Sequence, residues 1–129
     1  MSQPELSAIL DSFATALARL HDALSQPKSE WTRDAAIQRF EFTFELAWKT
    51  LSRFAEREGM QCASPRQALK AALHVGWIED EPGWLDMLND RNRTTHTYRE
   101  ATAEEIYSRL KEYADRLTRL QQRLALELQ

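Results

Sequence analysis

The spacing of apolar residues constrains this chain more than any other feature of its sequence. Along three long segments, apolar side chains recur alternately three and four residues apart, which places them on one face of an α-helix. The three series are Leu6, Leu10, Phe13, Leu17, Leu20 and Leu24; Ile37, Phe40, Phe44, Ala47, Leu51 and Phe54; and Ile106, Leu110, Tyr113, Leu117, Leu120 and Leu124. The sequence contains no period-two alternation long enough for a strand, and no internal repeat. The pattern predicts an all-α protein.

Start and stop signals divide this pattern into five helices. Ser64 and Pro65 form a strong helix start, and Gly59 and Gly76 are suited to ending helices. We expect helices over about 4–25, 32–58 and 65–76, from Pro82 through a polar run at 91–98, and from a Thr102/Glu105 capping box to the C-terminus. Three long helices and two shorter ones predict an antiparallel four- to five-helix bundle, forming one domain over residues 1–129.

Composition narrows the class of protein and its compartment. A hydrophobic share of 43% and a charged share of 29% are typical of a globular domain rather than a disordered chain. The net charge of −3 argues against a protein that coats nucleic acid non-specifically, but allows a local basic site. Cys62 is the single cysteine, so we expect no intrachain disulfide and a cytoplasmic location. With no leader pattern and no apolar run of about 18 residues, we expect no membrane segment.

The polar run Arg91-Asn92-Arg93-Thr94-Thr95-His96-Thr97-Tyr98 carries the chemistry that we consider most informative. Arginine binds phosphate through a planar fork of donors, and histidine transfers protons near neutral pH, so the pair suits phosphodiester cleavage. On a straight helix Asn92 and His96 share a face, whereas Arg91 and His96 lie about 140° apart. A local distortion near Thr94, or a second copy across a two-fold axis, would bring Arg91 and His96 into one groove.

The residues alone leave a plainer interpretation open. Arg91 and Arg93 are then solvated surface charges, and His96 caps a helix or packs, an interpretation that local chemistry by itself favours. His21, His74 and His96 lie far apart in the sequence, and the acidic residues at 79–81 match no liganding pattern. We therefore predict no metal site and no cofactor. The acidic run itself is interpreted as a loop or as a docking surface for a partner.

Three motifs in this order resemble the nucleotidyltransferase substrate-binding protein family of the HEPN superfamily. They are Phe42-Thr43-Phe44-Glu45-Leu46-Ala47-Trp48-Lys49-Thr50-Leu51, Ser64-Pro65-Arg66, and Asp90 followed by the polar run. The resemblance covers about residues 6–120. The superfamily pattern Arg-(polar)-x-x-x-His falls on Arg91, Asn92 and His96. The extended pattern of HepT-type toxins, Arg-x4-His-x-Tyr, falls on Arg91, His96 and Tyr98.

This resemblance implies a homodimeric helical bundle that acts as a metal-independent endoribonuclease on RNA. It implies Arg91, His96 and Asn92 as catalytic residues, and a small nucleotidyltransferase as the antitoxin that transfers AMP to Tyr98. A nucleotide on Tyr98 adds bulk and negative charge beside His96, where an RNA phosphate must enter. The older family name implies an alternative, a non-catalytic subunit that binds substrate for a nucleotidyltransferase. A purely structural helical adaptor is a third hypothesis.

For several further residues the sequence allows two interpretations. Glu45 either lies on a solvated edge or pairs with Arg91 and holds its guanidinium in place. Arg93 either adds positive potential for RNA or is a lone surface charge. Tryptophans at helical spacing are more often core than base-stacking platforms, so Trp48, Trp77 and Trp84 are predicted to be buried, and Trp31 to be a staple or an interface residue.

Overall fold

The computed structural model describes residues 2–129, which fold into five α-helices and one 3₁₀ turn without any β-strand. The elements are α1 (Gln3–Ser25), α2 (Glu30–Arg57), α3 (Pro65–Val75), α4 (Glu81–Arg93), η1 (Thr94–His96) and α5 (Glu100–Glu127). The prediction of an all-α helical bundle is confirmed. No helix formed by residues 2–129 is long and apolar enough to cross a bilayer.

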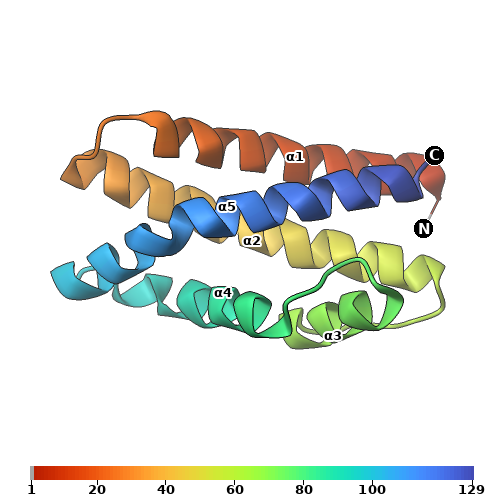
Figure 1. Ribbon diagram of the computed structural model, residues 1–129. Coiled ribbons are helices and arrows are strands. Elements are labelled where there is room, and N and C mark those ends of the chain that lie inside the picture. Colours follow the sequence, from red (N-terminus) through yellow and green to blue (C-terminus); the bar gives the residue numbers. More distant parts are fainter. Residues whose placement is uncertain (1) are drawn as a thin grey trace.

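The three long helices α1, α2 and α5 pack along one another, and α3 and α4 follow end to end along the remaining side (Figure 1). The chain reverses direction between α1 and α2, α4 runs opposite to α2, and the chain reverses again between α4 and α5 (Figure 1). Both termini therefore lie at one end of the bundle, where the Gln3 side-chain amide donates to the carbonyl of Leu128 at 2.6 Å. The α4–α5 connection lies at the other end (Figure 1).

The three predicted apolar series form the core. Every member is buried except Leu24, which is partly buried against the same cluster. The ring of Phe40 stacks on that of Tyr113 with centroids 5.5 Å apart, which joins α2 to α5. Trp77 and Trp84 are buried as predicted, and Trp48 is partly buried. Trp31 is 86% exposed, so it packs against no core residue as a staple would.

Side-chain caps explain most helix starts. The Ser29 hydroxyl accepts from the backbone N–H of Thr32, and Thr32 reciprocates, so α2 begins two residues earlier than predicted. Ser64 caps α3 as predicted, accepting from the N–H of Gln67. Gly76 ends α3 at φ +82, a left-handed conformation that glycine adopts without a steric penalty.

Two predicted boundaries are wrong. The Thr102/Glu105 capping box does not form: α5 begins at Glu100 after Arg99, and the Glu105 carboxylate pairs with Arg93 instead. The fourth helix also does not continue through the polar run, because α4 ends at Arg93. The straight-helix placement of Asn92 and His96 on one face therefore does not apply.

Threonine hydroxyls account for the early end of α4. The hydroxyl oxygen of Thr94 lies 2.7 Å from the carbonyl of Arg91, and that of Thr97 donates to the carbonyl of Thr94 at 3.1 Å. Such short-range bonds to carbonyls three residues back compete with the regular helical ladder and favour a tighter turn. The chain passes from α4 into the 3₁₀ turn η1 at this point.

Candidate active site

The polar run occupies the last turn of α4, the turn η1 and the short link to α5, at the end of the bundle opposite the termini (Figure 1). Arg91, Asn92 and Arg93 belong to α4, and His96 closes η1. Tyr98 lies in the link between η1 and α5. The predicted residues are therefore presented by a sharp change of direction rather than by one straight helix.

A buried carboxylate fixes the end of α4 against α5. Asp90 is 2% exposed and accepts hydrogen bonds from Arg109 at 2.6 and 2.9 Å and from the Tyr113 hydroxyl at 2.6 Å. Burial acts to raise the pKa of Asp90, but the hydrogen bonds from Arg109 and Tyr113 prevail and hold that pKa below its ordinary value. Burial, reinforced by the hydrogen bond to Asp90, raises the pKa of Tyr113.

Sequence reasoning missed the role of Asp90, although the residue directly precedes Arg91. The sequence alone does not show whether a polar side chain beside a motif is buried. The available signal was the position of Asp90 two residues after the apolar Leu88, in a segment flanked by core residues.

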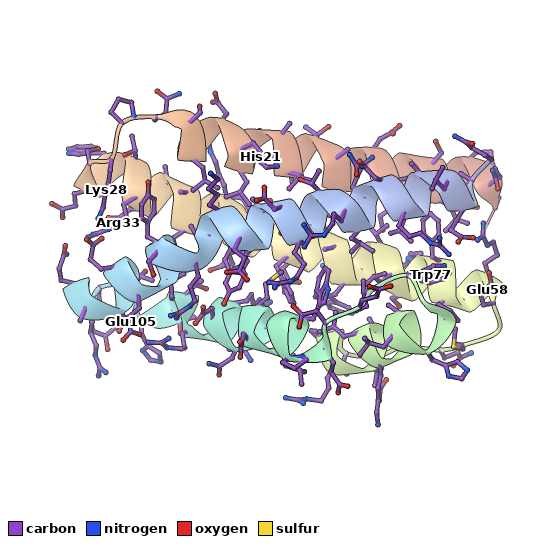
Figure 2. The ribbon with its side chains drawn as sticks, in the orientation of Figure 1. His21, Lys28, Arg33, Glu58, Trp77 and Glu105 are labelled. Atoms are coloured by element: carbon purple, nitrogen blue, oxygen red, sulfur yellow. The ribbon has the colours of Figure 1, made fainter. Side chains whose placement is uncertain are left out.

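A second set of ion pairs holds the beginning of α5. Arg33 of α2 is almost fully buried and pairs with Glu100 and Glu104, and Lys28 donates to Glu104 at 2.6 Å. The hydrogen bond to Glu100 raises the pKa of Arg33. Figure 2 labels Lys28, Arg33 and Glu105 at this same end of the bundle. The connection that carries His96 and Tyr98 is thus anchored on both sides.

Arg91 is partly buried and forms an ion pair with Glu45 of α2. Its Nη1 also donates to the Oδ1 of Asn92 at 3.3 Å. Of the two interpretations of Glu45, the structure gives the pair with Arg91. Lys49 Nζ lies 3.8 Å from the other oxygen of the Glu45 carboxylate. Arg91 therefore has a defined position, with part of its fork engaged by a carboxylate.

Arg93 is not a lone surface charge. Its Nη2 donates to Glu105 at 2.5 Å and its Nη1 donates to Asp90 at 3.1 Å. The hydrogen bond to Glu105 raises the pKa of Arg93. With two carboxylates beside it, this guanidinium braces α4 against α5 and offers little free positive potential.

His96 and Tyr98 are both exposed, and their rings approach edge to face with centroids 6.0 Å apart. The Tyr98 side chain is 74% exposed, and the guanidinium of Arg99 lies over its ring at 5.6 Å. Among residues 2–129 the imidazole of His96 has no hydrogen-bond partner, so it neither caps a helix nor packs in the core. The His96 imidazole is exposed to solvent.

Within one chain, Arg91 is paired with Glu45 rather than with His96. Within the described residues no hydrogen bond or ion pair joins Arg91 to His96, and Arg91 is turned toward α2 by Glu45. No group of three or more His, Cys, Asp or Glu side chains suited to a metal ion gathers in residues 2–129. The site thus consists of an exposed imidazole and phenol beside a positioned guanidinium.

The chain is similar in sequence to known proteins. A family model described as nucleotidyltransferase substrate binding protein like matches residues 8–126. A relative from Haemophilus influenzae, named Probable ribonuclease HepT, is 30% identical over 83 residues, which is 60% of this chain. The matched part spans 57% of that relative, little more than half of its length.

Two solved structures share the fold. The crystal structure of ttk003001694 from Thermus thermophilus is 42% identical, covers 87% of this chain and 98% of its own, and superposes with a TM-score of 0.81. HI0074 from Haemophilus influenzae is described as having the fold of a substrate binding domain of a nucleotidyltransferase. It is 25% identical, with a TM-score of 0.69 over 96% of this chain and 99% of its own.

Proposed function

Because this chain belongs to the nucleotidyltransferase substrate-binding protein-like family, we propose that it is the RNA-cleaving toxin of a pair whose other member is a nucleotidyltransferase. The observation that carries the proposal is the exposed His96 and Tyr98 in one surface turn, directly after the positioned Arg91. The relative named as a probable ribonuclease supports the same activity.

The chemistry requires a base, an acid and a cation. A neutral His96 accepts the proton of an RNA 2′-hydroxyl, and the 2′-oxygen attacks the adjacent phosphorus. The bond from phosphorus to the 5′-oxygen breaks, and that oxygen takes a proton from a second imidazole. Arg91, steadied by Asn92, holds the non-bridging oxygens as charge develops on them. The products are a 2′,3′-cyclic phosphate and a 5′-hydroxyl, with no metal ion involved.

This scheme needs two copies of the chain. Each chain contributes one His96, and its own Arg91 is engaged by Glu45. A two-fold axis beside the α4–α5 connection supplies the second imidazole and sets the Arg91 of one protomer toward the His96 of its partner. We therefore include a homodimer in the proposal.

Tyr98 is the proposed site of silencing by the partner enzyme. Its phenol oxygen attacks the α-phosphorus of ATP, pyrophosphate leaves, and the phenolic proton is lost to solvent. The exposure of the Tyr98 side chain leaves its oxygen open to another protein. The added phosphodiester lies next to the His96 ring, where its bulk and negative charge oppose the entry of an RNA phosphate.

A comparison of histidine variants tests the nuclease. The wild-type chain, His96→Ala and the control His74→Ala are expressed without the partner, since His74 is also exposed but lies on α3. We expect the wild type and His74→Ala to arrest growth and to leave RNA fragments with 2′,3′-cyclic phosphate ends. His96→Ala should do neither. Equal harmlessness of all three would reject the proposal.

Silencing is tested on the His96→Ala protein, which accumulates without toxicity if the nuclease proposal holds. After incubation with the partner nucleotidyltransferase and ATP, mass spectrometry should find AMP on the peptide that contains Tyr98. Tyr98→Phe should remain unmodified. An untouched Tyr98 peptide beside AMP at another residue would contradict this assignment.

A non-catalytic substrate-binding subunit is the second candidate, favoured by the description of the family and of HI0074. In that case the nucleotidyltransferase should act on its substrate only in the presence of this chain. His96→Ala should then support the transferase as well as the wild type does, and RNA should stay intact with either protein.

A further inference from the structure

A cavity of about 310 Å³ lies at the start of α4, far from the polar run at its end. The loop that joins α3 to α4 forms one wall and the middle of α5 forms the other. Trp77, labelled in Figure 2, lies in this loop and lines the cavity with Ile78 and Trp84. The part of α4 that precedes Arg91 separates the start of the helix from the polar run, about 15 Å at the usual rise.

Three arginines of α5 line the cavity: Arg116, Arg119 and Arg123. Their spacing of three and four residues places them on one face of the helix. Arg119 is exposed and has no carboxylate partner among residues 2–129. Arg123 is exposed and pairs with the half-buried Glu127 at 3.3 Å, one helical turn away. Ion pairs of this kind at the surface are weak. Two guanidinium groups are therefore available to a ligand.

Arg116 differs because it is only 9% exposed. Its hydrogen bonds both start from Nη2, reaching Asp80 at 2.8 Å and Glu112 at 3.1 Å. Its Nε is buried without an acceptor among residues 2–129. A guanidinium carries five N–H donors, so Arg116 retains donors beyond those that Asp80 and Glu112 use.

The position of Arg116 is unusual for a cation. Asp80 caps α4 by accepting from the N–H of Gly83, and a Cβ on Gly83 would collide with both Asp80 Oδ2 and Arg116 Nη2. The guanidinium therefore lies directly against the first turn of α4, which is the positive end of that helix dipole. Asp80 already occupies the N-terminus of α4, so the donors that this cavity offers to an anion are those of its three arginines.

The carboxylates in the lining limit the charge that the cavity accepts. Asp80 is engaged by Arg116 and by the backbone of α4, and Glu79 is exposed. Glu112 pairs with Arg116 and Glu127 pairs with Arg123, so four carboxylates in all lie beside the three arginines. The cavity therefore offers directed N–H donors, chiefly those of Arg119 and the spare donors of Arg116, rather than an excess of positive charge. Such donors fit a single phosphate group better than a long polyanion.

We propose that this cavity binds the phosphate group of a small ligand, either free phosphate or the phosphate of a nucleotide. Arg119 and Arg123 hold the phosphate oxygens, with Arg116 and the start of α4 behind them. The Trp77–Ile78 side offers an apolar wall for the rest of a nucleotide, and the volume lies within the range of small-molecule sites. This site is separate from the proposed ribonuclease site and does not depend on it.

Isothermal titration calorimetry of the full chain at low salt tests the proposal, with inorganic phosphate, AMP and ATP as probes. Arg119→Gln should raise the Kd roughly tenfold, the loss expected for one charge-assisted contact. Arg66→Gln is the matched control, because Arg66 is exposed and unpaired within residues 2–129 but does not line the cavity. Arg91→Gln should likewise leave the Kd within about twofold if the polar run is not the binding site.

Comparing the Kd values of inorganic phosphate, AMP and ATP shows which part of a ligand the cavity recognises. Equal affinity for phosphate and AMP assigns recognition to the phosphate group, and tighter binding of AMP adds contacts on the Trp77 side. Absence of binding by all three probes at millimolar concentration would overturn the proposal. Binding lost in Arg91→Gln but retained in Arg119→Gln would also overturn it. Thermal unfolding of Arg119→Gln checks that the variant is folded, as its exposure leads us to expect.

Discussion

The ion pair between Glu45 and Arg91 matters more for orientation than for stability. Both side chains keep more than a quarter of their surface exposed, so the pair contributes at most about 1 kcal/mol to folding. It nevertheless links α2 to the residue on which phosphate binding is proposed to depend. A guanidinium held in one place loses less conformational freedom when a phosphate arrives.

For Glu45→Gln we expect about a tenfold fall in the rate of RNA cleavage, because the neutral amide holds the fork of Arg91 less firmly. The measurement is the single-turnover rate on a defined RNA. Glu56→Gln removes a comparable exposed carboxylate of α2, one that pairs with Arg53, and should cleave at the wild-type rate. If Glu45→Gln cleaves RNA as fast as Glu56→Gln does, Glu45 does not position Arg91 for cleavage.

The sequence identified those residues that belong to a known motif, but not those whose role depends on partners distant in the chain. Arg91, His96 and Tyr98 stood out because their chemistry and spacing match a family pattern. Asp90 did not, since nothing in its neighbours shows that Arg109 and Tyr113 lie opposite it, 19 and 23 residues away. The pairing of Arg93 with Glu105 was also hidden, because it depends on how α4 turns into α5.

At the scale of elements, the joint between α4 and α5 depends on one carboxylate. Asp90 gathers Arg93, Arg109 and Tyr113 from both helices around a group that is nearly inaccessible to solvent. A buried charge that loses its partners is costly, so the joint is strong only while Asp90 is ionised. The turn η1 begins directly after this joint, so the joint fixes where η1 starts.

Asp90→Asn should lower the free energy of unfolding by about 2 kcal/mol at pH 7, since several charge-assisted hydrogen bonds are lost. The pKa of Asp90 is lowered from an ordinary value of 3.8, so as pH falls the unfolded chain binds the proton first. Its stabilisation is complete above about pH 4 and is lost as pH falls through the folded-state pKa. The gap between wild type and variant should therefore narrow in acid.

Urea unfolding at pH 7, 5 and 3 measures this gap. Asp86→Asn is the matched control, because Asp86 is exposed on the same helix and has no ion-pair partner in residues 2–129. It should differ little from wild type at any pH. A gap for Asp90→Asn that is small at pH 7, or that stays constant down to pH 3, would contradict the assigned role.

The helices themselves were predictable because their apolar series follow the helical period over many turns. Their ends were less so, and the errors have local causes. The four-residue stretch from Thr94 to Thr97 contains three threonines, whose hydroxyls compete with the helix ladder in a way that periodicity does not register. The Thr102/Glu105 box failed because Glu105 has a better partner in Arg93.

At the scale of the molecule, the bundle buries its own apolar series, so a second copy is not needed to cover them. What one chain leaves incomplete is the proposed catalytic arrangement, since it holds a single His96 and its Arg91 is paired with Glu45. Large exposed side chains remain at Trp31 and Phe42 in addition to Tyr98. The requirement for a dimer thus arises from the proposed chemistry rather than from an unfinished core.

Mixing the wild type with an inactive variant tests a shared site. When the wild type and His96→Ala are coexpressed in equal amounts, half of the dimers are mixed and hold a single His96 imidazole, which cannot serve as both base and acid. Cleavage by the purified mixture should therefore fall to roughly a quarter of that of the same amount of wild type, with native mass spectrometry to quantify mixed dimers. A fall to only about a half would show that each chain cleaves with its own His96, and a persistent monomer would remove the scheme altogether.

The hydrogen bond from Gln3 to the carbonyl of Leu128 has a practical consequence. Since both termini meet at the face remote from the α4–α5 connection, a bulky fluorescent reporter or a surface anchor fused to either one leaves that connection unobstructed (Figure 1). A short peptide bridge between the termini would close the polypeptide into a ring. Such circularisation restricts the denatured ensemble and should raise the melting temperature without altering a single native contact.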